Sequence, residues 1–219
     1  MTPLLSALRE LRDDRRAVSV IEFALMLPMF IAFVATSIEF GNFVMANNRV
    51  QRMAAMTADL VAQSGVGVIG ATEGQIYDLF SALDLTARPF DLRRHGRVVI
   101  TGVRGTDNDN DKIVEPRILW QRFDGDYIAA IPLLGCADKS DIARLPAGRT
   151  LPLNEILFHV QVTYDYQPVF SDLPFGWLDL DPAFTRTATF RARSNQFQSP
   201  TPDPKRFPPK SNCATADGL

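Results

Sequence analysis

A carboxylate in an apolar run is the first feature of this sequence that needs a chemical explanation. Glu22 lies just inside an apolar run that has no charged residue from Phe23 to Ile38, and extending the run to Ala46 adds only Glu39. A charge that enters a bilayer is costly unless it has a partner or reaches water at the interface. Glu22 therefore either pairs with a cation or extends its carboxylate to the interface, and its position alone leaves both roles open.

The two cysteines, Cys136 and Cys213, provide the thiol chemistry of the chain. Neither belongs to a CxxC motif, so their spacing does not indicate a redox or zinc site. In an oxidising compartment the two thiols could pair, and the alternative is that both stay free. A bridge would pin the C-terminal tail to the domain, which makes it the candidate disulfide of the chain.

Signals for catalysis and metal binding are weak. Asp107, Asp109 and Asp111 alternate like the start of a calcium loop. Lys112 and Ile118 then stand where such a loop needs glycine and glutamate. The sequence contains no GxSxG, no HExxH and no phosphate-binding glycine loop. We therefore predict no enzyme activity, no cofactor and no metal site.

Composition limits the class of protein. The chain has 219 residues, of which 46% are hydrophobic, and a formal net charge of -2. This length suits one domain with appendages. The small net charge provides no field that favours nucleic acid, so we expect no nucleic-acid partner.

The elements that position these groups begin with one long helix. If Val18 to Ile38 is helical, it rises roughly 31 Å at about 1.5 Å per residue, which matches the hydrocarbon core of a bilayer. Apolar residues then recur at helical spacing among polar ones, which predicts an amphipathic continuation. We predict a transmembrane and amphipathic helix over residues 17–64, bent at Pro28 because proline removes one backbone hydrogen bond.

Basic residues before the span predict its orientation. Arg15 and Arg16 directly precede the span, and positive charges beside a span tend to stay cytoplasmic. We therefore expect a cytoplasmic N-terminus and a C-terminal domain on the far side of the membrane. A cleaved secretory signal is the competing interpretation, since residues 35–37 imitate a cleavage site. The helical pattern continues beyond that site, which favours the anchor.

The remainder of the chain predicts an α+β domain. Thr72 and Gln75 form a capping box for a short helix, expected over Glu73 to Asp84 and packed on a small antiparallel sheet. Four β-rich stretches follow, of which the last two should pair antiparallel: 97–103, 117–123, 154–166 and 183–193. Alternation in the third stretch puts His159 opposite the core face, so we predict it on the solvent side or at an edge.

The N-terminal residues resemble the TadE-like pseudopilin family, a branch of the type IV pilin-like proteins. In that family the leader-peptidase motif is a glycine, four variable residues, a glutamate and an aromatic residue. Here Ala17 takes the glycine position, and Glu22 and Phe23 take the last two. The resemblance implies cleavage between Ala17 and Val18, and the alternative is that the segment stays as an uncleaved anchor. The closing strands, with residues 164–168, also resemble the end of TadE-like proteins.

The resemblance gives Glu22 a partner. Cleavage would leave an α-ammonium on Val18, and in the pilin scheme the carboxylate pairs with the ammonium of a neighbouring subunit. The implied partners are the bilayer, the prepilin peptidase, other pilin-like subunits and the inner-membrane platform of a tight-adherence (Flp-type) pilus. The implied location is the bacterial inner membrane.

We thus predict four segments: a cytoplasmic basic leader at 1–16, the helix at 17–64, a periplasmic α+β domain at 65–196 and a Pro-rich flexible tail at 197–219. The leading hypothesis is a non-catalytic, minor pilin-like subunit for pilus assembly. The alternative is a single-pass anchor that holds a periplasmic binding or sensory domain. A secreted hydrolase is a weaker third interpretation.

Overall fold

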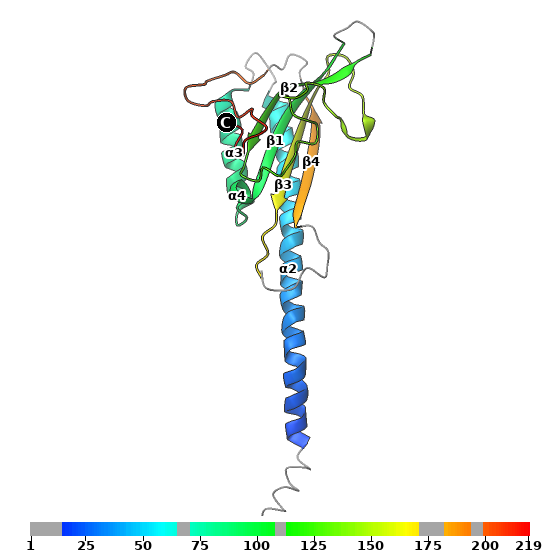
Figure 1. Ribbon diagram of the computed structural model, residues 1–219, viewed down its shortest axis with the longest axis vertical. Coiled ribbons are helices and arrows are strands. Elements are labelled where there is room, and N and C mark those ends of the chain that lie inside the picture. Colours follow the sequence, from blue (N-terminus) through cyan, green and yellow to red (C-terminus); the bar gives the residue numbers. More distant parts are fainter. Residues whose placement is uncertain (1–14, 65–70, 108–112, 171–181, 194–198) are drawn as a thin grey trace, which may run out of the picture. The chain divides into compact units, whose positions relative to one another are not determined.

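The computed structural model describes residues 15–64, 71–107, 113–170, 182–193 and 199–219. A long helix is followed by a short helix and a four-stranded antiparallel sheet (Figure 1), which confirms the predicted α+β fold. The elements are α2 (Arg15–Ser64), α3 (Glu73–Ala87), α4 (Leu92–His95), β1 (Gly96–Thr106), β2 (Glu115–Asp124), η1 (Pro146–Gly148), β3 (Ile156–Asp165) and β4 (Ala183–Arg191).

The chain forms two compact units, and α2 contributes to both. The first unit comprises Met1–Val44 with Pro168–Leu173, and the second comprises Met45–Gln167 with Pro174–Leu219. The sequence prediction kept the whole helix, 17–64, as one segment. The units divide inside it because only its amphipathic part has a buried face that packs within the second unit.

α2 is a single helix that continues through Pro28. In the second unit its buried side chains recur every three or four residues, which is the pattern of an amphipathic helix with one face against a core: Ala46, Val50, Met53, Ala54, Thr57, Ala58, Val61 and Ala62. The helix begins slightly before the predicted start and ends at the predicted residue. The bend at Pro28 stays a prediction.

The sheet has the strand order β2-β1-β3-β4, with every neighbour antiparallel. β1 and β2 are consecutive strands, and their register shifts between Gly102 and Val103. β3 and β4 pair from Leu157↔Arg191 to Asp165↔Ala183, so the predicted pairing of the last two strands is confirmed.

One face of the sheet packs against the helices (Figure 1). Arg122 of β2 lies on this face and donates a hydrogen bond to Glu73, the first residue of α3, at 3.0 Å. Arg186 of β4 donates to Asn47 of α2 at 2.7 Å. α2 and α3 therefore cover the face that the strand alternation predicted as core.

The opposite face is buried as well, beneath the segment between β2 and β3. The side chain of Gln161 accepts from the Leu133 N–H and donates to the Ile131 carbonyl. A second apolar cluster forms on this side: Val103, Ile118, Leu134, Ala143 and Leu151. His159 is only 1% exposed, so its predicted place at the solvent side or an edge was wrong. β3 is an inner strand of the sheet. The face of β3 that carries His159 is covered by the segment between β2 and β3, and the alternation of apolar residues within β3 gives no information about that segment.

α3 begins with the predicted capping box. The Thr72 hydroxyl accepts from the Gln75 N–H at 3.3 Å, and the Gln75 side chain accepts from the Thr72 N–H at 3.0 Å. The helix continues to Ala87, beyond the predicted end at Asp84. The extension adds one more buried apolar contact on the same face, because Ala87 follows Leu83 by one turn.

Residues 199–219 pack on the second unit, which corrects the predicted flexible tail. The Thr201 carbonyl accepts from the Glu73 N–H at 3.1 Å, and the Lys210 carbonyl accepts from the Phe123 N–H at 2.9 Å. Proline-rich composition disfavours regular helices and strands, but its carbonyl groups still accept hydrogen bonds from neighbouring segments. The tail is therefore held without being a regular element.

Candidate functional site

The predicted processing residues lie in the first turns of α2. Arg15, Arg16 and Ala17 open the helix, and Glu22 and Phe23 follow. The side chains of Glu22 and Phe23 are both exposed. The Glu22 carboxylate is therefore accessible to a group from outside the chain, as a pairing role requires. Cleavage after Ala17 and pairing by Glu22 stay predictions.

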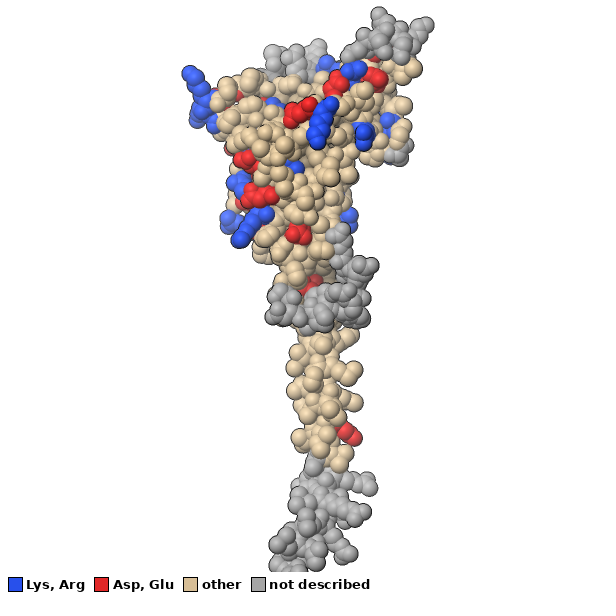
Figure 2. Space-filling model, viewed as in Figure 1, with Lys and Arg blue, Asp and Glu red and all other residues tan. Residues whose placement is uncertain are grey.

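The helix presents an exposed apolar surface in the first unit. Its most apolar window has a mean hydropathy of 2.3 and is 0% buried, whereas the core helix of a soluble protein would be mostly buried. The visible face of this part of α2 carries hardly any charge (Figure 2). By length and composition, Val18–Gln63 is the one helix among the described residues that could cross a membrane. This indicates a single-pass membrane anchor.

Glu39 has a different environment from Glu22. Its side chain is only 3% exposed. The Val169 N–H donates to its carboxylate at 3.0 and 3.3 Å, and the Phe170 N–H donates at 3.1 Å. All three residues belong to the first unit. The carboxylate thus fixes the segment Pro168–Phe170 to the helix.

Sequence reasoning missed this site. It noted Glu39 only as the charge that interrupts an uncharged run. The available signal was the carboxylate itself, because a charge among apolar residues needs a partner. The partner lies 130 residues later along the chain and donates through backbone N–H groups, which carry no side-chain signature.

Residues 17–59 match the family model described as "TadE-like protein". The matched segment lies within α2 and contains its apolar surface and Glu39. This part of α2 is similar to TadE-like proteins. This confirms the resemblance seen at the N-terminus, while the closing strands lie outside the match. No curated protein and no solved structure matches the chain.

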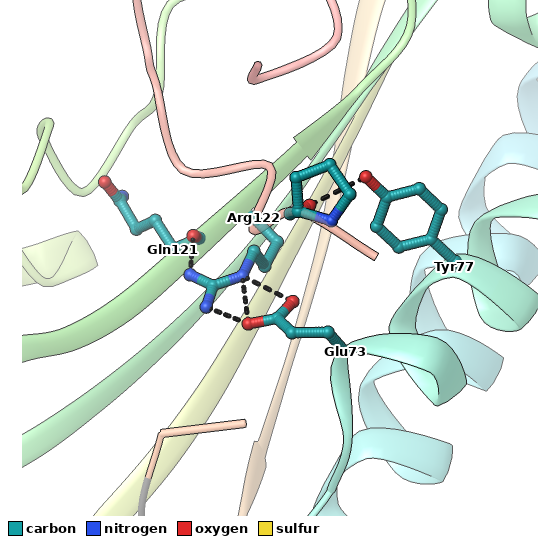
Figure 3. Close-up of polar contacts among 5 residues, drawn as sticks. Glu73, Tyr77, Gln121 and Arg122 are labelled. Carbon is teal, nitrogen blue, oxygen red and sulfur yellow. Dashed lines mark hydrogen bonds and ion pairs between the residues drawn. The ribbon is translucent and has the colours of Figure 1, made fainter. Parts of the chain in front are cut away.

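A buried ion pair joins α3 to β2 in the second unit (Figure 3). The Arg122 Nε donates to both oxygens of Glu73, at 3.1 and 3.0 Å, and Nη2 also pairs with Oε1. Arg122 Nη1 donates to the Gln121 carbonyl at 2.7 Å. Beside the pair, the Tyr77 hydroxyl donates to the Pro208 carbonyl at 2.7 Å. Burial, followed by the nearby Glu73 charge, raises the pKa of Tyr77.

A second buried arginine holds the end of the chain. Arg97 is 1% exposed and donates through Nη2 to the carbonyls of Cys213 and Thr215, at 2.9 and 2.8 Å. Its Nη1 donates to the carbonyls of Ile128 and Ala130. Burial lowers the pKa of the guanidinium. These carbonyl contacts fix the C-terminal segment to the second unit.

The structure joins Cys136 to Cys213 by a disulfide, with the two Cα atoms 6.2 Å apart. Asp138 lies close enough for its carboxylate and the two sulfurs to fall within 4.8 Å of one another. Sulfurs bonded in a disulfide are not thiolates, so this group fits a bridge rather than a metal site. Asp109 and Asp111 of the calcium-like pattern lie outside the described residues.

Proposed function

We propose that this chain is a minor pilin-like subunit for assembly of a tight-adherence (Flp-type) pilus. It acts without catalysis, as an anchored assembly protein. The observation that carries the proposal is the TadE-like match at residues 17–59, which falls on a helix whose most apolar stretch is 0% buried. Exposed apolar surface of this length is stable only against lipid or other apolar helices.

The proposed location is the bacterial inner membrane, with the leader cytoplasmic and the α+β domain periplasmic. Arg15 and Arg16 at the start of α2 support this orientation. The disulfide between Cys136 and Cys213 also supports it, because disulfides persist in the periplasm and are rare in the cytosol.

Glu22 carries the proposed mechanism. The prepilin peptidase cuts after Ala17, and Val18 then bears an α-ammonium group. The exposed Glu22 carboxylate of one subunit pairs with the ammonium of a neighbour. The attraction offsets part of the cost of placing either charge near hydrocarbon. Because the two charges meet at only one alignment of the helices, the pair sets the register of adjacent subunits. The further partners are other pilin-like subunits and the inner-membrane platform.

The test is the intact mass and N-terminal sequence of the protein purified from membranes, with and without the prepilin peptidase. We expect a start at Val18 only when the peptidase is present. Ala17→Leu should block the cut, and Val20→Ala, at a variable position of the motif, should not.

The same samples distinguish the alternative. A membrane-bound chain that keeps its leader in both strains would contradict the pseudopilin function. It would favour a single-pass anchor for a periplasmic binding or sensory domain. The long exposed helix alone is compatible with that alternative, and the family match favours the pilin-like subunit.

A further inference from the structure

The contact between Glu39 and the segment Pro168–Phe170 lies on the helix that is proposed to cross the membrane. The depth of Glu39 in the bilayer therefore matters. Glu39 follows directly after the uncharged run that ends at Ile38. From Phe23 to Ile38 the helix rises only about 24 Å, whereas the hydrocarbon core is about 30 Å thick. If Glu22 lies at one edge of that core, Glu39 therefore lies within or at the other edge.

The apolar surface of the helix does not end at Glu39. Phe40, Val44 and Met45 remain exposed beyond it. Glu39 itself lies on a covered face, where Ala35 and Phe43, one turn away on either side, are half-buried. The helix thus continues to present apolar side chains to its surroundings, while its carboxylate is withdrawn from them.

The segment that covers the carboxylate is itself apolar on its outer side. Val169 is 65% exposed and Phe170 is 37% exposed, although both backbone N–H groups bind Glu39. Non-helical backbone near hydrocarbon is unfavourable unless its polar groups have partners. Glu39 satisfies two of these N–H groups, and they in turn solvate its charge.

We propose that Pro168–Phe170 forms a second membrane contact, lying in the interfacial layer where α2 leaves the bilayer, with Glu39 as its tether. The exposed side chains of Val169 and Phe170 form an apolar patch, and this patch contacts the lipid surface. The argument is continuity, because the patch adjoins the lipid-exposed surface of α2 within the same unit. Apolar and aromatic side chains are favoured at this level of a membrane. The inference rests on the anchoring part of the proposed function, and not on leader cleavage.

The test measures depth by spin-label accessibility in the full, oxidised chain, reconstituted in phosphatidylcholine–phosphatidylglycerol vesicles. Single labels are attached through Val169→Cys, Met29→Cys and Ser81→Cys. Met29 is exposed in the apolar part of α2, and Ser81 is exposed on α3. We expect high contact with lipid-soluble oxygen at Met29, high contact with an aqueous nickel reagent at Ser81, and an intermediate, interfacial value at Val169.

Each other outcome overturns the inference in a recognisable way. A Val169 label as accessible to nickel as the Ser81 label would place the segment in water. A label shielded from both reagents would mean that protein, such as a second copy, covers the patch. An aqueous Met29 label would contradict the membrane anchor itself, which is a failure of the proposed function rather than of this contact alone.

The tether is tested by Glu39→Ala in the Val169-labelled chain. We expect the label to lose its oxygen contact and approach the value at Ser81. Glu39→Gln keeps one oxygen acceptor and should retain part of the contact. Ser37→Ala is the matched control, because its hydroxyl donates to the Phe33 carbonyl of its own helix at 2.8 Å and to no other group among the described residues. An unchanged Val169 depth in Glu39→Ala, with helix content preserved, would contradict the tether.

Discussion

Two buried arginines of this protein have hydrogen-bond acceptors, whereas the buried His159 has an unpaired ring nitrogen. Arg122 has Glu73, and Arg97 has backbone carbonyls, so the cost of removing each charge from water is offset by hydrogen bonds. His159 is equally buried, yet its Nε2 has no hydrogen-bond partner among the described residues. A histidine in such a place is stable only when neutral, and burial accordingly lowers its pKa to about 4.

His159 should make stability depend on pH. The folded pKa of about 4 lies below the ordinary histidine value of 6.5, so the unfolded chain binds the proton more readily. The contribution of neutral His159 to the free energy of unfolding is fully present above about pH 6.5. It is lost as the pH falls toward about 4, and the loss amounts to on the order of 3 kcal/mol. His159→Gln should reduce this dependence. Chemical denaturation of the full chain in detergent, between pH 7 and pH 4.5, would measure it.

Carboxylates also titrate in this range, so the informative quantity is the difference between wild type and His159→Gln at each pH. Equal pH dependence in both proteins would contradict the assignment.

At the scale of elements, local signals explain where α3 begins. The reciprocal bonds of Thr72 and Gln75 satisfy backbone N–H groups that have no partner inside the helix. The start of α3 has a second role, because Glu73 receives Arg122 from the sheet and its N–H bonds the Thr201 carbonyl. The cap thus positions a residue that connects three segments.

Thr72→Ala should lower the free energy of unfolding by about 1 kcal/mol, because the Gln75 N–H loses its acceptor. Urea denaturation would measure the change. Thr86→Ala is the control, since its exposed hydroxyl donates to the Ala82 carbonyl of the same helix and to no other group in the part of the chain that the structure describes. An equal loss in both variants would show that the cap has no special contribution.

At the scale of the whole molecule, the last residues of the chain complete the second unit. The carbonyls of Cys213 and Thr215 bind Arg97, and Lys210 pairs with Asp124 at the end of β2. The disulfide adds a covalent link across a sequence separation of 77 residues. Closing so long a loop restricts the unfolded chain more than the folded one.

Replacing both cysteines, Cys136→Ser with Cys213→Ser, should therefore destabilise the second unit by about 4 kcal/mol on the chain-entropy account. Thermal unfolding would report the loss, and limited proteolysis should show earlier cleavage in residues 199–219. Wild-type protein after reduction serves as the control and should behave like the double variant. Complete alkylation of both thiols in the denatured, unreduced chain would contradict the bridge.

The sequence by itself determined the elements and the anchor. Apolar periodicity predicted α2, the capping box predicted α3, and alternation predicted the pairing of β3 with β4. These signals are local, because a helix or strand is specified by residues a few positions apart. The same is true of the N-terminal motif around Glu22, which lies within the family match.

Only the tertiary structure decided the partners of the buried polar groups. Glu39 bonds backbone N–H groups, the carbonyls of an irregular tail hold Arg97, and a loop covers His159. A backbone N–H or carbonyl is present at almost every residue, so the sequence does not mark which one will be a partner. The number of residues between a side chain and its backbone partner depends on how the chain folds and follows no local sequence pattern. For this reason the membrane helix was predictable from residue types, whereas the tether and the packed tail were not.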